Sequence, residues 1–203
     1  MQNHLLSSET FLSREEECLL LRIARASLTT WVLHGKRLDL EDFPLTPALE
    51  TRCGVFVTLR AHKALRGCIG TVKARDALAR AVLEYVINAA SHDPRFHPLQ
   101  LHELETTTIE LSALSPGDEV DSPLRRVNDI SEIVVGRDGL YIERPPHRGG
   151  LLLPQVAVEH DMSVLDFLNA VCRKANYPER AWELEGTRLF RFTAQVFGEP
   201  SSG

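Results

Sequence analysis

Leu65-Arg66-Gly67-Cys68-Ile69-Gly70 is the stretch of sequence that decides how the fold is understood. The residues are typical of a β-strand, with a cysteine standing between two glycines. Glycine weakens a strand interior because it contributes no side-chain packing and loses much entropy on folding. Gly67 and Gly70 therefore predict that another group approaches this backbone closely. Strand alternation places Arg66 and Cys68 on one face, so we expect the thiol and the guanidinium to share a side.

The flanking sequence predicts a hairpin covered by helices. A strand from Cys53 to Leu59 precedes the motif, and the short turn Ala61-His62-Lys63-Ala64 joins the two strands. Ser13-Arg14-Glu15-Glu16 has the pattern of a capping box and opens a helix to about Leu33. Arg75-Asp76 starts a second amphipathic helix, which we expect to cover the apolar side of the hairpin.

The rest of the chain mixes further strands with helices. We expect a strand at Thr106–Leu114, a hairpin of 133–135 with 140–143 turned by Asp138-Gly139, and a helix from Ser163 to Ala175. We expect a last strand at Arg188–Phe197, whose inward-facing residues are Phe190, Phe192, Ala194 and Val196. The chain from Glu199 onward is expected to fray. Hairpins among helices favour an α+β fold with a mixed, largely antiparallel sheet and flanking helices.

Composition limits the class of protein. With 43% hydrophobic residues the chain of 203 can bury a real core, and its formal net charge of −5 disfavours nonspecific binding to nucleic acid. No stretch is long and apolar enough to span a bilayer. Because Met1–Thr10 has no basic start and no apolar core, we predict no signal peptide and a cytoplasmic location.

The four cysteines are widely spaced and form no C-x-x-C pair, so neither a disulfide framework nor a zinc knuckle is indicated. Cys18 and Cys172 stand among helical apolar positions and are expected to be buried. Cys68 is the candidate for chemistry. A free thiol is mostly protonated at neutral pH, so catalysis needs help from Arg66 or from a histidine base. The alternative is a buried, unreactive thiol.

The second informative stretch is Ser91-His92-Asp93-Pro94-Arg95-Phe96-His97-Pro98, a loop forced by two prolines. His92 or His97 is a candidate base for the thiol. The spacing of the two histidines matches no standard metal site, and no nucleotide-binding signature occurs, so we expect no metal and no cofactor. Asp93 is expected to cap loop amides, with Arg95 clamping a carboxylate such as Glu110.

Several motifs together resemble the AMMECR domain family, in the order found in that family. They are Gly54-Val55-Phe56-Val57-Thr58-Leu59, Leu65-Arg66-Gly67-Cys68-Ile69-Gly70, Asp93-Pro94-Arg95-Phe96, Glu110-Leu111-Ser112, Gly150-Leu151-Leu152-Leu153-Pro154-Gln155-Val156 and Cys172-Arg173-Lys174-Ala175. The turn residues Lys63-Ala64 depart from the pattern, because a glycine is common there in the family.

The resemblance implies a single α+β domain over residues 13–197, with a larger and a smaller lobe around a cleft that carries the motif. Residues 1–12 and 198–203 are then expected to be flexible tails. The resemblance also implies partners, a Memo-like protein and a radical SAM protein in the AmmeMemoRadiSam grouping. It supplies no reaction, because a fold alone does not define an activity.

The leading hypothesis is a cysteine-dependent enzyme or carrier in a modification pathway, with Cys68 as nucleophile. Glu110 and His92 are assigned to proton transfer. A small-molecule or peptide ligand is assigned to these residues: Arg66, Gly67, Gly70, Asp93, Arg95 and Gln155.

Two other functions stay open. In the first, the chain is a noncatalytic adaptor whose glycines admit a partner backbone while Cys68 merely packs. In the second, it is a nucleic-acid-associated regulator that uses a local basic patch: Arg125, Arg126, Arg137, Arg144 and Arg148.

Overall fold

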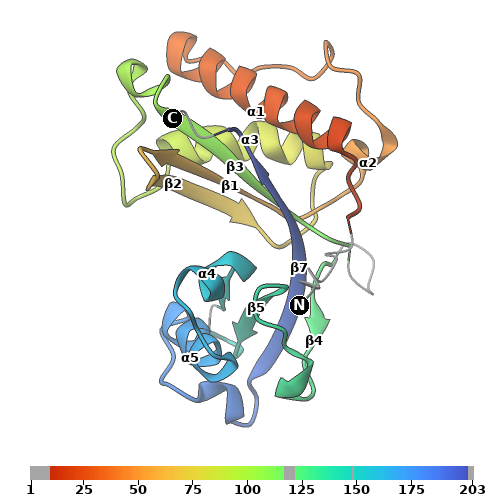
Figure 1. The fold of residues 1–203 in the computed structure, drawn as a ribbon, viewed down its shortest axis with the longest axis vertical. Helices are drawn as coiled ribbons and strands as arrows, with labels where there is room; N and C mark the ends of the chain where they lie inside the picture. Colours follow the sequence, from red (N-terminus) through yellow and green to blue (C-terminus); the bar gives the residue numbers. More distant parts are fainter. Residues whose placement is uncertain (1–9, 117–121, 148, 201–203) are drawn as a thin grey trace, which may run out of the picture. The chain divides into compact units, whose positions relative to one another are not determined.

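The computed structural model describes residues 10–116, 122–147 and 149–200. The chain forms two compact units. The larger unit holds residues 10–114 and the end of the chain from Gln195, and the smaller unit holds residues 115–194. Helices and antiparallel strands occur in both, which confirms the α+β class (Figure 1).

The larger unit begins with α1, Arg14–His34, and its two ends are set by local sequence. The Ser13 side chain accepts a hydrogen bond from the Glu16 backbone, and the Glu16 carboxylate accepts one from Ser13, so the predicted capping box is present. Gly35 ends the helix in the left-handed conformation at φ 62°. The first helix therefore has the predicted bounds to within a residue.

The sheet of the larger unit contains β1, Val55–Ala61, β2, Ala64–Thr71, and β3, Thr107–Leu114, in the order β2-β1-β3 with every pair antiparallel. The end of β7, Arg188–Gly198, follows β3. The motif strand β2 is thus an edge strand.

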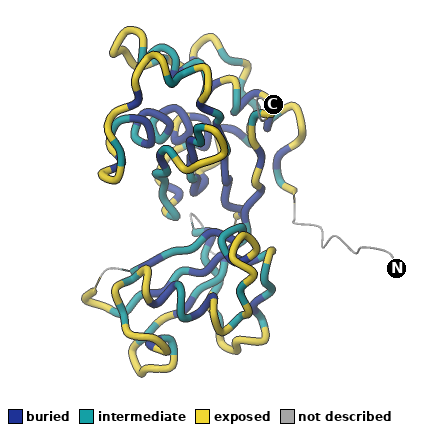
Figure 2. The backbone as a smooth tube through the Cα atoms, turned by 60° about the vertical axis from the view of Figure 1, so that its left-hand side comes forward, coloured by how far each residue is buried: buried dark blue, intermediate teal, exposed yellow. Residues whose placement is uncertain are grey.

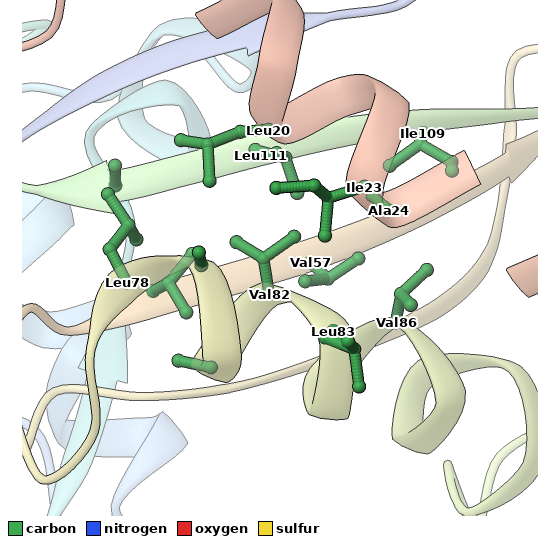
Figure 3. Close-up of a cluster of buried hydrophobic side chains, with 14 of the residues drawn as sticks. Leu20, Ile23, Ala24, Val57, Leu78, Val82, Leu83, Val86, Ile109 and Leu111 are labelled. Atoms are coloured by element: carbon green, nitrogen blue, oxygen red, sulfur yellow. The ribbon is translucent and has the colours of Figure 1, made fainter. Parts of the chain in front are cut away.

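The remaining elements of this unit are α2, Pro47–Glu50, α3, Leu78–Ser91, and the short 3-10 helix η1, Leu101–Glu103. The two long helices α1 and α3 pack on one face of the sheet. The buried side chains of this core come from both helices and from β1 and β3, as Figure 3 shows: Leu20, Ile23, Ala24, Val57, Leu78, Val82, Leu83, Val86, Ile109 and Leu111. Buried segments are found in each unit (Figure 2).

The smaller unit contains β4, Arg125–Arg126, β5, Asp138–Glu143, and β6, Gly150–Leu152, together with most of β7. Its strand order is β7-β5-β6, and β4 pairs with β7. Its helical elements complete the unit: η2, Ile130–Glu132, α4, Pro154–Glu159, α5, Val164–Lys174, and η3, Ala181–Glu183. A core built around Phe167, Leu168 and Val171 of α5 holds it together.

The predicted hairpin of 133–135 with 140–143 is wrong. Residues 133–135 form no strand, and β5 pairs with β6 and β7 instead. Asp138 is fully buried inside β5, where its carboxylate accepts hydrogen bonds from the Val134 amide and the Arg137 guanidinium. Gly139 is needed for close packing, because a methyl group there would lie 2.3 Å from the Phe192 ring.

The chain end also differs from expectation. Val196 was expected to face inward but is 42% exposed. Ala194 and Gln195 are both buried, so the alternation of buried and exposed positions shifts by one residue within β7. Glu199, expected to fray, forms an ion pair with Arg25, and its carboxylate accepts a hydrogen bond from the Ile109 amide. In addition, no helix within the described ranges has the length and apolarity needed to cross a membrane.

Candidate functional site

A one-residue bulge in β2 determines which way the motif side chains point. Leu59 pairs with Gly67 but Arg60 pairs with Leu65, so Arg66 is an extra residue without a cross-strand partner. Beyond the bulge, Gly67 shares the helix-covered face with Leu59, while Cys68 pairs with Thr58 on the opposite face. The period-two alternation of side chains between the two faces is therefore interrupted at Arg66, and it cannot be used to place Arg66 and Cys68 on the same face.

The half-buried thiol of Cys68 lies in a row that crosses three strands. Thr58 on β1 pairs with Cys68 on one side and with Glu110 on β3 on the other. The Thr58 hydroxyl donates a hydrogen bond to Cys68 Sγ over 3.4 Å. Glu110 forms an ion pair with Arg60 at 3.9 Å. A thiol, a hydroxyl and a carboxylate thus share the face of the sheet opposite α1 and α3.

The backbone of Cys68 is held from the open edge of β2 by two side chains of the loop after α3. The Asp93 carboxylate accepts a hydrogen bond from the Cys68 amide at 2.9 Å, and Arg95 Nη2 lies 3.5 Å from the Cys68 carbonyl oxygen. Arg95 in turn forks the same carboxylate through Nε at 2.9 Å and Nη2 at 2.7 Å. Carboxylate and guanidinium therefore take the place of a neighbouring strand at this one residue.

Asp93 and Arg95 behave only in part as the sequence suggests. Asp93 accepts a hydrogen bond from the Arg95 amide, so it caps the loop as expected. Arg95 clamps Asp93 and not Glu110, whose ion pair is with Arg60. The Asp93 side chain is only 2% exposed, whereas that of Arg95 is 49% exposed. The Arg95 hydrogen bonds, joined by those of the Cys68 and Arg95 amides, hold the pKa of Asp93 well below its usual range.

Arg66 is anchored away from the thiol. Its guanidinium forks the Glu103 carboxylate, with Nε at 2.7 Å and Nη2 at 3.0 Å, and Nη2 also donates to the His97 carbonyl oxygen. The Phe96 ring lies 5.8 Å from the Arg66 guanidinium carbon and 5.5 Å from that of Arg95. Arg66 lowers the pKa of Glu103 to about 2. The structure thus uses Arg66 to fasten the bulge to η1.

Both glycines of the motif are explained by the chain's own backbone. A methyl group on Gly67 would lie 2.2 Å from the Ala89 carbonyl oxygen of α3. On Gly70 it would lie 2.3 Å from the Val55 carbonyl oxygen and 2.6 Å from Phe56 Cδ1. The prediction of a close approach is confirmed, but the approaching groups are α3 and β1. The glycines therefore give no support to an adaptor that admits a partner backbone there.

The other predicted residues lie on further segments of the chain. His92 is exposed at the end of α3, where its amide donates to Asn88, and His97 contributes its carbonyl oxygen to Arg66. Within the described ranges no hydrogen bond joins either imidazole to Cys68. Gln155 lies on α4 of the smaller unit. Residues 10–116, 122–147 and 149–200 contain no cluster of three or more His, Cys, Asp or Glu side chains that could hold a metal ion.

Of the basic patch proposed for nucleic acid, Arg148 lies outside the described residues, and Arg137 is paired with the buried Asp138.

The remaining cysteines make useful references. Cys53 is buried and donates to the Leu114 carbonyl oxygen, and burial raises the pKa of its thiol to about 12. Burial also raises the pKa of Cys172. Cys18 was expected to be buried but is exposed, because it lies on the outer side of α1 beside Arg22. Cys18 and Cys68 are therefore the accessible thiols of the described chain.

Sequence reasoning missed two partners of the motif. Thr58 was expected only as a polar strand residue, and Glu103 was not considered. Counted from the turn without a bulge, Thr58 would pair with Gly67, so its contact with Cys68 could not be deduced. The sequence gives only a weak indication of Glu103. Gln100 and Glu103 are spaced as in a capping box, which indicates a helical turn at η1 but does not predict the contact with Arg66.

Comparison with known proteins gives consistent results over most of the chain. A family model described as AMMECR1 matches residues 21–197. The chain is 39% identical over 192 residues to protein MJ0810 of Methanocaldococcus jannaschii, covering 93% of this chain and 92% of that protein. It is 42% identical over 190 residues to a protein of Methanothermobacter thermautotrophicus, covering 93% and 96%. The fold is similar to the crystal structure of uncharacterized protein PH0010 from Pyrococcus horikoshii, with a TM-score of 0.81, 36% identity and 90% of each chain covered.

Proposed function

The chain belongs to the AMMECR1 family, and we propose that it uses Cys68 as a nucleophile or covalent carrier in a modification reaction. One observation carries the proposal. The thiol is half-buried on the sheet face opposite the helices, and the amide and carbonyl of that same residue are both held by the Asp93–Arg95 pair. A backbone fixed at both groups limits the movement of the residue that carries the sulfur, which favours a defined position for a reacting atom.

The proposed step is a nucleophilic displacement at carbon. The Cys68 proton passes to solvent by way of Glu110 or His92, and the sulfur electron pair forms a bond to an electrophilic carbon of the substrate. The leaving group departs with the electron pair of the broken bond. The product is a covalent adduct on sulfur, so no oxidant or reductant is consumed.

The charged neighbours are suited to different tasks. Arg95 is half exposed, and we assign it to an anionic group of the substrate. Glu110 lies in the row of the thiol and is assigned to proton transfer, with His92 as the second candidate. Arg66 is taken up by Glu103, so its proposed role is to hold the strand.

Single-cysteine reactivity tests the proposal. In the Cys18→Ser variant, Cys68 is the accessible thiol, and in the Cys68→Ser variant Cys18 is. Iodoacetamide should add one group to the first variant, detected by intact mass, with a rate at neutral pH roughly tenfold above that of glutathione. Cys18, tested in the second variant, should react like glutathione. A Cys68 that stays unmodified, or that reacts no faster than Cys18, would overturn the proposal.

The resemblance also supports two protein partners, a Memo-like protein and a radical SAM protein. We propose that the group carried on Cys68 passes to or from one of them. We expect the purified chain to gain mass when it is incubated with both proteins and a cell extract that supplies the substrate. The Cys68→Ser variant should show no such increase. The adaptor alternative predicts that the wild-type chain and the Cys68→Ser variant bind the two partners equally and that neither chain gains mass.

A further inference from the structure

We propose that the Thr58 hydroxyl belongs to the thiol site, where it orients the Cys68 sulfur and stabilises its thiolate. The inference rests on the proposed function and adds a residue that acts directly on the reacting atom. It stands on the 3.4 Å contact from Thr58 Oγ1 to Cys68 Sγ, a distance suitable for a hydrogen bond to sulfur.

The position of Thr58 makes this contact well defined. Thr58 lies on β1, the strand between β2 and β3, and is only 5% exposed. Its β-branched side chain has restricted rotation about the first side-chain bond. A buried hydroxyl must find a partner, and a donor to a charged acceptor favours the charged form of that acceptor.

Other threonines of the same sheet behave differently. Thr107 Oγ1 donates to the Glu103 carbonyl oxygen at 2.8 Å, and Thr108 Oγ1 lies 3.5 Å from the Arg60 carbonyl oxygen. Those hydroxyls satisfy backbone groups, as threonine commonly does. Thr58 instead directs its hydroxyl at a side chain that can carry charge. This contrast separates it from an ordinary strand threonine.

The bulge at Arg66 creates the contact. In a regular hairpin counted from the His62-Lys63 turn, Cys68 would pair with Val57 and face the helices. The extra residue brings Cys68 opposite Thr58 and onto the other face. The charged groups around this row are Glu110 on β3, Arg60 on β1, and Asp93 with Arg95 on the loop after α3. Within the described chain, the hydroxyl of Thr58 donates a hydrogen bond to the sulfur.

The test compares variants in the Cys18→Ser background. Thr58→Val keeps the shape and removes the hydroxyl, and Thr58→Ser keeps the hydroxyl. Thr58→Val should lower the iodoacetamide rate at neutral pH about tenfold and move the midpoint of its pH profile upward by about one unit, because a hydrogen bond to a charged group is worth about that much. Thr58→Ser should restore both values. Thr108→Val is the matched control and should change neither.

Thiolate ultraviolet absorbance gives the same midpoint without alkylation. It therefore distinguishes the two failures. An unreactive Cys68 whose absorbance midpoint still moves in Thr58→Val would reject the proposed function and keep the hydrogen bond. A reactive Cys68 with identical profiles in Thr58→Val and Thr58→Ser would reject the inference alone. If Thr58→Val does not fold, Thr58→Ala carries the comparison, and an unchanged midpoint there is equally decisive.

Discussion

The two faces of the sheet in the larger unit are under different constraints. On the helix-covered face, Gly67 lies against the Ala89 carbonyl of α3, and its neighbours across the strands are fully buried apolar residues such as Leu59 and Ile109. On the opposite face, one residue further along β2, Cys68 meets a hydroxyl. Adjacent residues of one motif therefore lie in two environments, a packed apolar one at Gly67 and a polar one at Cys68.

The residues of the motif can thus be divided by their physical surroundings. Space decides on the covered face, since no side chain fits at Gly67. On the other face Cys68 is half-buried and contacts a polar side chain, so space is the weaker constraint there. Substitutions on the first face should act on stability, and substitutions on the second should act on reactivity.

Gly67→Ala should give the largest effect. Its methyl group would lie 2.2 Å from a backbone oxygen, so α3 or β2 has to move. We expect the free energy of unfolding to fall by about 3 kcal/mol or more, measured by urea denaturation. Gly35→Ala is the control, because Gly35 has φ 62° but nothing within 4 Å of the added carbon. It should cost about 1 kcal/mol from backbone strain alone. Equal losses in the two variants would show that crowding is not the constraint.

Cys68→Ser is the matched change on the opposite face, and the comparison requires that it leave the unfolding free energy nearly unchanged. A loss similar to that of Gly67→Ala would mean that the thiol is a packing residue after all.

The next largest effect should come from the anchor of the bulge. Glu103 has its pKa lowered to about 2 by Arg66, below its ordinary value of 4.5. A lowered pKa means that the ion pair stabilises the fold fully above about pH 4.5 and is lost as the pH falls toward 2. The loss should be on the order of 3 kcal/mol, and Glu103→Gln should remove this part of the acid dependence.

The free energy of unfolding, measured by circular dichroism at a series of acid pH values, reports this effect. Glu183→Gln, which breaks the exposed Arg180–Glu183 pair, is the control and should leave the acid dependence as it is. An acid dependence in Glu103→Gln that equals that of the wild type would show that Arg66 is not held by charge. The bulge, and with it the separation of the two faces, would then need another cause.

Local rules predicted much of the fold, because the groups involved are close in sequence. The capping boxes at Ser13 and Ser163 use side chains three residues away, and both helices begin where expected. The apolar spacing after Arg75-Asp76 likewise predicted a helix that covers the hairpin, and α3 contacts both of its strands. These elements need no information from the rest of the chain.

The site could be predicted only in part, because it depends on contacts between distant residues. Arg66 and Glu103 are separated by 37 positions, and a one-residue bulge decides which face receives Cys68. Period-two alternation carries no signal for such an insertion. The turn predicted at Asp138-Gly139 was wrong for a related reason. The two residues are typical of a turn locally, but they pair with β7 and are buried as the start of β5. Candidate residues were therefore found by type, while their partners had to come from the structure.

Lys63→Gly should give the smallest effect and tests the turn that both faces share. His62 and Lys63 form the two-residue turn before β2, with φ 50° and 67°, values that glycine adopts without strain. Relief of about 1 kcal/mol at Lys63 is partly offset by the greater entropy of glycine in the unfolded chain, so the net gain should be about 0.5 kcal/mol. Urea denaturation measures it, with Lys63→Ala as the control that keeps the strain. The register on each side of the bulge should not change, so the alkylation rate of Cys68 should equal that of the parent. A changed rate would show that the turn, and not the bulge at Arg66, sets the face on which the thiol lies.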